Sequence, residues 1–274
     1  MHGRVAAITG AGSGIGRALA AELAAKGCHL ALSDIDKAGL EETVELVERP
    51  GIRVTAHAVD VADRAAMEEW AQQVVDHHGF VNLIVNNAGV ALGSTVEAMS
   101  YEDFEWLMGI NFWGVVHGTK AFLPHLRASG DGHIVNISSV FGLLGIPSQS
   151  AYNASKFAVR GFTEALRVEL DMAGGAVSCT TIHPGGIKTN IARSGRFDAA
   201  SLSALGQDPD RVVAASERAL RTAPERAAQV ILRAVERDRR RAMIGADAQV
   251  FKLLAMTPPG LYQRLIRLGT RIRL

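Results

Sequence analysis

The sequence of 274 residues lacks several features that mark whole classes of protein. Its two cysteines, Cys28 and Cys179, lie in apolar stretches, so we expect two buried thiols in a reducing compartment and no disulfide framework. Basic residues number 29 and acidic residues 28, so no overall charge attracts nucleic acid or an anionic membrane. No apolar run approaches the roughly 20 residues of a membrane span, and the strand-like run at residues 4–9 leaves no room for a signal peptide. These absences predict a cytoplasmic protein.

The sequence does contain a regular alternation of two kinds of segment. Short runs rich in β-branched residues are each followed by a longer segment with helical periodicity, which is typical of βαβ units. The expected strands cover residues 4–9, 28–33, 52–58, 81–85, 133–138, 177–182 and 242–246, and the clearest helical segments are 16–27, 65–79, 103–126 and 154–174. We predict an α/β fold: a single Rossmann-type, doubly wound domain over residues 1–274, with a seven-stranded parallel sheet and helices on both faces.

A glycine-rich segment, TGAGSGIG at residues 9–16, joins the first expected strand to the first expected helix. Glycines let the backbone turn tightly and approach a pyrophosphate, which the free N–H groups and the dipole of a helix N-terminus stabilise. A glycine motif in this position is much stronger evidence than the motif alone. It predicts a dinucleotide site, and the residues expected to contact the dinucleotide are Gly10, Ser13, Gly14, Ile15 and Gly16.

Asp34 ends the second expected strand, where a carboxylate can accept hydrogen bonds from the adenosine ribose. A 2′-phosphate would place like charges about 4 Å apart there, at a cost on the order of 4 kcal/mol per pair of unit charges for a dielectric of about 20. The sequence therefore favours NAD over NADP. Lys37 and Arg17 are close enough in sequence to weaken this preference, although we expect both on helix surfaces.

Tyr152 and Lys156 lie four residues apart, so on a helix their side chains project from one face. Taken alone, such a pair is ordinary surface. A phenol has an unperturbed pKa of about 10, and both an adjacent ammonium and a cationic nicotinamide favour the phenolate. We therefore expect Lys156 to lower the pKa of Tyr152, which would make the phenol an effective acid/base.

Five landmarks follow one another along the chain: TGxxxGxG at 9–16, NNAG at 86–89, Ser139 thirteen residues before Tyr152, the Tyr152/Lys156 pair, and PGxxxT at 184–189. In this arrangement the sequence resembles the short-chain dehydrogenase/reductase family from Arg4 to about Thr189. The resemblance implies an oxidoreductase that moves a hydride between NAD(H) and a secondary alcohol or ketone. The mainly apolar segment 140–150 suggests an apolar substrate, although its side chains could equally pack under a helix.

The resemblance also implies roles for individual residues. Tyr152 would exchange the substrate proton, Lys156 would also bind the nicotinamide ribose, Ser139 would hydrogen-bond the substrate oxygen, and Asn111 would hold a water of a proton relay. The implied cofactor contacts beyond the glycine segment are Asp34, Asp60, Val61, Asn87, Tyr152, Lys156, Pro184, Ile187 and Thr189. Asp60 could also serve as the N-cap of the following helix. His183 is expected to be a loop residue rather than an acid, and no metal site is expected.

Two other functions stay open. One is an NADPH-dependent ketoreductase, and the other is a sensor or scaffold that binds NAD without turnover, against which the intact Ser139, Tyr152 and Lys156 argue. Residues from about 190 to 222 show no strand signal and are long enough to form a lid over the substrate. The family commonly forms homodimers or homotetramers through the helices that contain Asn111 and Tyr152.

The segment from about 248 to 274 is basic and amphipathic. It has five basic residues and no acidic ones, interleaved with large apolar residues. Such a segment can form a helix that lies on a membrane. We favour the alternative, in which the segment covers the substrate cleft or packs on another subunit.

Overall fold

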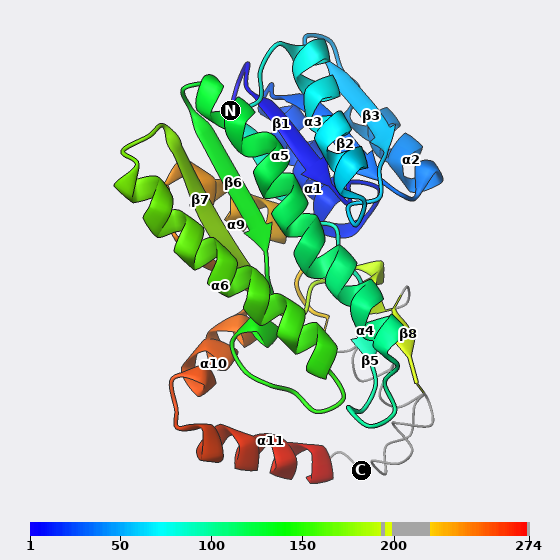
Figure 1. The fold of residues 1–274 in the computed structure, drawn as a ribbon, viewed down its shortest axis with the longest axis vertical. Coiled ribbons are helices and arrows are strands. Elements are labelled where there is room, and N and C mark those ends of the chain that lie inside the picture. The colour runs from blue at the N-terminus through cyan, green and yellow to red at the C-terminus, as the bar shows by residue number, and fades with distance from the viewer. Residues whose placement is uncertain (193–194, 199–219, 273–274) are drawn as a thin grey trace.

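The fold is built on a parallel sheet of seven strands, in the order β3-β2-β1-β4-β6-β7-β9 (Figure 1). This computed structural model describes residues 1–192, 195–198 and 220–272. All seven predicted strands are confirmed, and their bounds are β1 Val5–Thr9, β2 His29–Asp34, β3 Val54–Ala58, β4 Leu83–Asn86, β6 Gly132–Ile137, β7 Val177–Pro184 and β9 Arg241–Ile244. The central strands are nearly continuous apolar runs because helices cover both faces of a parallel sheet.

Helices lie on both faces of this sheet, as predicted (Figure 1). On one face, buried leucines and isoleucines of α1 (Gly14–Ala25) and α9 (Pro224–Glu236) share a core with α2 (Lys37–Val47). On the other face, Trp70, Phe122 and Leu166 come from α3 (Arg64–His78), α5 (Gly114–Ala128) and α6 (Ser150–Met172). Cys28 and Cys179 are buried and unpaired within these two cores, as expected.

The strand order reverses between β1 and β4, because the chain builds outward to β3 and then continues on the other side of β1. In an open parallel sheet, ligands bind in the crevice at the carboxyl ends of the strands next to such a reversal. The glycine segment follows β1 at this edge, and the NNAG segment begins with the last residue of β4. The topology therefore brings these two motifs together.

The segment predicted as one helix over residues 103–126 is interrupted. It forms α4 (Tyr101–Met108), a π-helical turn (Gly109–Trp113) and α5. The extra residue of a π-turn changes which side chains face inward. The turn buries Asn111 completely, so this asparagine is neither a surface residue nor part of a regular helix.

Two helices follow the last strand: α10 (Ala246–Ala255) and α11 (Pro259–Ile272). In Figure 1, α11 lies at the far end of the molecule from the sheet, and α10 connects it to the rest of the fold. Most of the predicted lid, at residues 199–219, lies outside the described residues. Its flanks include β8 (Arg196–Phe197), which pairs with β5 (Leu92–Gly93). Within the part of the chain that is described, no helix is both long and apolar enough to cross a membrane.

Candidate active site

The glycine segment forms a tight turn between β1 and α1. Gly10 and Gly14 have φ angles of +64° and +51°, which favour glycine. A Cβ on Gly16 would lie 2.1 Å from the carbonyl oxygen of Gly10. Ser13, the N-cap of α1, makes no side-chain capping bond, and the first N–H groups of a helix have no acceptor within it. These N–H groups fit the charge of a pyrophosphate.

Asp34 lies beside this turn at the end of β2. Its Oδ2 accepts a hydrogen bond from the backbone N–H of Gly12 at 2.8 Å, and its Oδ1 accepts one from the N–H of Asp36 at 3.0 Å. Each carboxylate oxygen has a second acceptor site. The carboxylate is therefore oriented by the backbone and keeps the capacity to accept from ribose hydroxyls.

Arg17 was expected on a helix surface, and in the structure it is half-buried and fully engaged. Its guanidinium donates to the carbonyl oxygens of Gly12 and Gly39 and to Thr43 Oγ1, and it forms an ion pair with Glu42 at 2.7 Å. The side chain thus fastens the glycine turn to α2. The expectation was wrong because α2 packs directly against α1 and supplies acceptors to its surface. Lys37 is exposed, as expected.

Asn87 also stabilises the glycine turn. Its Nδ2 donates to the carbonyl oxygens of Thr9 and Gly10 at 2.9 and 3.1 Å, while the hydroxyl of Thr9 accepts from the N–H groups of Asn87 and Ala88. A Cβ on Gly10 would lie 2.8 Å from Ala88 Cα. The segments after β1 and β4 are therefore in close contact, and the Asn87 amide is used within the protein.

Asp60 and Val61 lie in the turn after β3. Asp60 is exposed, and its carboxylate accepts from the N–H of Ala62 at 2.9 Å. The N-cap of α3 is Asp63, whose side chain accepts from two N–H groups of the first turn. The interpretation of Asp60 as the N-cap was wrong because α3 begins at Arg64, three residues later than an N-cap at Asp60 requires. Val61 is buried, and its carbonyl oxygen lies 3.0 Å from His117 Nδ1.

The PGxxxT segment lies next to the glycine turn, although the two are far apart in sequence. Pro184 ends β7, Ile187 is buried, and a Cβ on Gly14 would lie 2.9 Å from Thr189 Cγ2. A cavity of about 490 Å³ lies where the two segments meet, lined by Gly12, Ser13 and Gly14 on one side and by Lys188, Thr189 and Asn190 on the other. The predicted cofactor residues of both segments are thus brought together.

Asp247, which the sequence did not single out, holds the PGxxxT segment. Its Oδ2 accepts from the N–H of Gly186 at 2.6 Å. A Cβ on Gly185 or Gly245 would lie 2.3 Å from a carboxylate oxygen of Asp247, so only glycine fits at these two positions without a shift. A carboxylate in the first turn of a helix directly after a strand and a glycine was the available signal.

Ser139, Tyr152 and Lys156 meet at the same edge of the sheet. Ser139 follows β6, and Tyr152 lies in the first turn of α6, where the Ser139 side chain acts to lower the pKa of the phenol. Lys156 is one turn further along α6, with its Nζ 5.6 Å from the centroid of the Tyr152 ring. Lys156 also donates to the carbonyl oxygen of Ile137 at 3.1 Å. The predicted constellation is assembled.

The electrostatics of the pair differ from the expectation in direction. Burial raises the pKa of Tyr152 to about 12, although the hydrogen bond with Ser139 opposes this rise. Burial also lowers the pKa of Lys156 to about 8. We expected Lys156 to lower the pKa of Tyr152, but in the protein alone desolvation of the phenol raises it, and the opposing cause is Ser139.

Asn111 lies close to Lys156 but is held by the backbone. Its amide exchanges two hydrogen bonds with Val90, at 2.8 and 2.9 Å, and its Nδ2 lies 3.3 Å from Ser155 Oγ. A Cβ added to Gly89 would lie 3.1 Å from Asn111 Oδ1 and 3.5 Å from Lys156 Nζ, so these two side chains meet at this glycine. Asn111 therefore fixes the segment after β4 against the catalytic end of α6.

Two further polar residues shape the site. His183 is part of β7 rather than a loop, and its Nδ1 lies 2.8 Å from the carbonyl oxygen of Ser139. Burial lowers the pKa of His183 to about 4, which agrees with the expectation that it is no acid. Asn153, which the sequence analysis missed, donates to the carbonyl oxygens of Phe141 and Leu144 and accepts from the N–H of Ile146.

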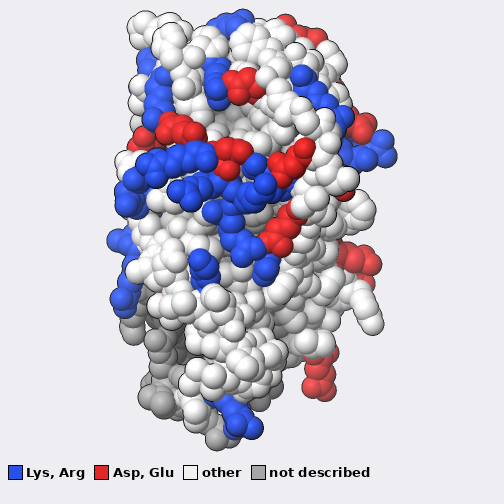
Figure 2. All heavy atoms as spheres, turned by 90° about the vertical axis from the view of Figure 1, so that its left-hand side faces the viewer, with Lys and Arg blue, Asp and Glu red and all other residues white. Residues whose placement is uncertain are grey.

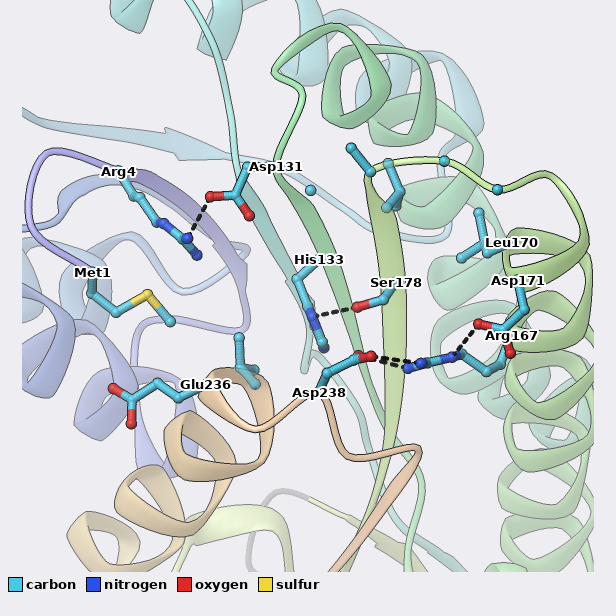
Figure 3. Close-up of a pocket in the computed structure, with 16 residues that line it drawn as sticks. Met1, Arg4, Asp131, His133, Arg167, Leu170, Asp171, Ser178, Glu236 and Asp238 are labelled. Atoms are coloured by element: carbon cyan, nitrogen blue, oxygen red, sulfur yellow. Dashed lines mark hydrogen bonds and ion pairs between the residues drawn. The ribbon is translucent and has the colours of Figure 1, made fainter.

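A second cavity, of about 570 Å³, lies at the opposite edge of the sheet, where the strands begin (Figure 3). Its charged side chains bind one another: Arg167 donates to both carboxylate oxygens of Asp238 at 2.7 Å, and Arg4 pairs with Asp131. His133 lies 2.8 Å from the Ser178 hydroxyl. Ion pairs of Arg167 with Asp238 and of Glu164 with Arg241 join α6 to the region of β9. Figure 2 shows a band of mixed charge across one face of the molecule. This network stabilises the fold and lies away from the motifs.

Comparison with known proteins agrees with this geometry. A family model described as short chain dehydrogenase matches residues 4–199. Putative oxidoreductase SadH of Mycobacterium tuberculosis is 49% identical over 269 residues, which cover 98% of this chain and 95% of that protein. A short chain dehydrogenase/reductase from Burkholderia phymatum, solved in complex with NAD, has a TM-score of 0.82 and 35% identity over 88% of this chain and 89% of its own.

A more distant solved structure carries the other dinucleotide. An alcohol dehydrogenase from the archaeon Thermococcus sibiricus, complexed with 5-hydroxy-NADP, has a TM-score of 0.72 and 28% identity over 88% of this chain and 95% of its own. Together, the family match, the extent of these similarities and the assembled motifs show that the chain belongs to the short-chain dehydrogenase/reductase family and is an NAD(P)-dependent oxidoreductase.

Proposed function

We propose that the protein is an NAD-dependent dehydrogenase of secondary alcohols, with Tyr152 as its acid/base. The observation that carries this proposal is the contact of the Tyr152 hydroxyl with Ser139 and the position of Lys156 one turn further along α6. All three lie at the sheet edge that also holds the glycine turn. The cofactor residues fit a dinucleotide because side chains at Gly10 and Gly16 would collide with the backbone.

In the direction of oxidation, the Tyr152 phenolate removes the proton of the substrate hydroxyl while Ser139 holds the substrate oxygen. When bound, oxidised nicotinamide accepts the hydride and carries a positive charge that favours the phenolate. Lys156, with a pKa of about 8, is mostly an ammonium at pH 7 and adds to that field. In reduction, Tyr152 returns the proton to the carbonyl oxygen.

Asn111 supports this chemistry by position. Its hydrogen bonds to Val90 hold the backbone near Lys156. A water bound beside Asn111 would connect Lys156 to solvent in the proton relay that the family resemblance implies. Lys156 would in turn bind the nicotinamide ribose, and Asp60, Val61, Asn87, Pro184, Ile187 and Thr189 would complete the cofactor site.

The preference for NAD rests on Asp34. Its carboxylate, held by Gly12 and Asp36, would repel a 2′-phosphate, at a cost on the order of 4 kcal/mol per unit pair before rearrangement. The NAD complex of the Burkholderia relative supports this choice, whereas the Thermococcus structure carries an NADP analogue. Titration of each dinucleotide, followed by tryptophan fluorescence, separates the two: tighter binding of NADP(H) would favour an NADPH-dependent ketoreductase.

An apolar substrate is supported by Phe141, whose ring meets that of Tyr152 edge-on at 5.9 Å between centroids. Leu143 and Leu144 are buried within the protein itself. A panel of secondary alcohols of increasing apolar size, assayed for NADH formation, tests this proposal. Higher kcat/KM for small polar alcohols would contradict it.

Replacement of Tyr152 by phenylalanine tests the acid/base role. We expect kcat/KM to fall by about 10²- to 10⁴-fold, which is the usual contribution of general acid/base catalysis, while the dissociation constant for NAD stays nearly the same. Tyr101→Phe is the matched control, because Tyr101 is highly exposed. Turnover at the normal rate in Tyr152→Phe would remove the proposed base, and a chain that binds NAD but turns over no alcohol or ketone would be a sensor or scaffold.

The remaining sequence predictions belong to the same proposal. They are a single domain over residues 1–274, a cytoplasmic location and a homodimer or homotetramer. The mass of the protein in solution, measured by light scattering, tests the oligomeric state.

A further inference from the structure

The helix α11 exposes a stripe of leucines. Leu261, Leu265 and Leu268 are 49%, 47% and 50% exposed, and their spacing of four and three residues places them on one face of the helix. Tyr262 and Ile266 are less exposed and lie on another side of the helix. About half of each leucine side chain in this stripe is therefore open to solvent.

A basic stripe borders these leucines. Arg264 and Arg267 are exposed, and each lies within one turn of Leu265 and Leu268. From residue 248 to 274 the sequence has five basic residues and no acidic residue. The charged side chains of this segment are thus all basic. The long stem of an arginine side chain can lie along an apolar surface while its guanidinium stays in a polar layer.

The preceding helix, α10, continues the same surface. Val250, Leu253 and Met256 are more than half exposed, and Lys252 lies among them. In Figure 1, α10 and α11 form one end of the molecule. In the lower part of Figure 2 the described surface is largely uncharged, with one basic side chain near the bottom and one acidic side chain at the right-hand edge. Two consecutive helices thus combine exposed apolar side chains with basic ones.

We propose that α10 and α11 dock on the surface of an anionic phospholipid membrane. Apolar side chains of an interfacial helix enter the boundary between headgroups and acyl chains, and its basic side chains bind anionic headgroups. A second copy of this chain, joined through the same face, would bring arginines against arginines. An anionic membrane complements the basic side chains of these two helices.

The docked surface would be continuous with the candidate active site. Phe251 of α10 packs against Phe141 at 6.2 Å between ring centroids, and Phe141 packs against Tyr152 at 5.9 Å. If the proposed function holds, an apolar substrate dissolved in the bilayer would have a short path to Tyr152. The docking itself does not depend on that function, because it is measured without turnover.

Sedimentation with vesicles tests the proposal on the full-length protein. We expect it to sediment with vesicles of phosphatidylglycerol and phosphatidylcholine and much less with phosphatidylcholine alone. Because each basic residue near an anionic surface contributes about fivefold to binding, Arg264→Glu should weaken the partition coefficient by about 25-fold. Leu265→Gln should weaken it by about tenfold, since a half-exposed leucine loses about half of its burial free energy.

Matched controls separate docking from general effects of charge or polarity. Arg226→Glu reverses an exposed arginine of α9, and Leu46→Gln replaces a leucine of α2 that is 55% exposed. Both controls should bind vesicles like the unmodified protein, and all four variants should keep their melting temperature. Equal binding of Arg264→Glu and its control would overturn the proposal, as would a change in oligomeric mass in Leu265→Gln with no loss of vesicle binding.

Discussion

Asn153 lies in the first turn of α6 and fastens the segment that joins β6 to that helix. Its Nδ2 donates to the carbonyl oxygens of Phe141 and Leu144 at 2.7 and 2.8 Å, and its Oδ1 accepts from the N–H of Ile146 at 3.0 Å. Replacement by aspartate keeps the shape of the side chain and removes both N–H donors. A carboxylate oxygen would then face two carbonyl oxygens in a largely buried position.

The expected cost follows from these contacts. Each buried acceptor left without its donor costs about 1–3 kcal/mol, and the stronger bond from Ile146 to a charged oxygen offsets part of the sum. We expect Asn153→Asp to lower the free energy of unfolding by about 2–4 kcal/mol, and hence the melting temperature by roughly 5–10 °C for a chain of this size. Turnover should fall as well, because Phe141 also donates its N–H to Ser139 Oγ at 3.1 Å.

Calorimetry and urea unfolding measure the loss of stability, and Gln249→Glu is the control because it adds a carboxylate at an exposed position of α10. The loss of unfolding free energy in Asn153→Asp should become smaller as the pH falls, since a protonated carboxyl regains one donor. A variant as stable as the unmodified protein at pH 7 would refute the reasoning. An equal loss in the control would refute it too.

Three further substitutions test other contacts. Asp247→Ala removes the acceptor for the N–H of Gly186 and should weaken NAD binding by about tenfold in a fluorescence titration, since a hydrogen bond to a charged group contributes about 1.5–3 kcal/mol; unchanged affinity would contradict its positioning role. Gly16→Ala should abolish NAD binding, because its Cβ would lie 2.1 Å from the carbonyl oxygen of Gly10; binding at the normal affinity would rule out the tight turn. Burial lowers the pKa of His133 to about 4, so the unfolded chain takes up that proton first and stability should fall as the pH drops from about 6.5 to 4. By pH 5 this histidine alone should cost about 2 kcal/mol in urea unfolding, and His133→Gln should lose less between pH 7 and pH 5; an equal loss in both proteins would assign the effect elsewhere.

The strands and the glycine turn could be predicted because their causes are local. A strand buried on both faces reads as an apolar run, and a turn such as that at Gly10 needs glycine whatever packs around it. Ser139, Tyr152 and Lys156 could also be placed, since the end of a parallel strand and the start of the next helix share one edge of the sheet.

The sequence did not reveal hydrogen bonds between residues that are far apart along the chain. Nor did it reveal properties that depend on how deeply a side chain is buried. Asp247 binds Gly186 across 61 residues, and Arg17 reaches acceptors on α2. A local pattern can single out such a side chain, as it does for a carboxylate after a strand and a glycine, but it does not identify the partner. The π-turn that buries Asn111 depends on what packs against it. The direction of the Tyr152 pKa was wrong because the cost of desolvating a phenol follows from the packed site and not from the spacing of Tyr and Lys.

Asp34 and Asp247 have the same structural role at two places on the carboxyl edge of the sheet. Each carboxylate accepts the N–H of a glycine in a loop that would contact the cofactor, at 2.8 Å for Gly12 and 2.6 Å for Gly186. Loss of Asp34 would therefore disorder the glycine turn and also remove the charge that repels a 2′-phosphate. Because disorder of the turn weakens both dinucleotides, the ratio of the two dissociation constants cancels the effect of the loop. That ratio reports the specificity that the Asp34 carboxylate would provide, by accepting from the ribose of NAD and by repelling a 2′-phosphate.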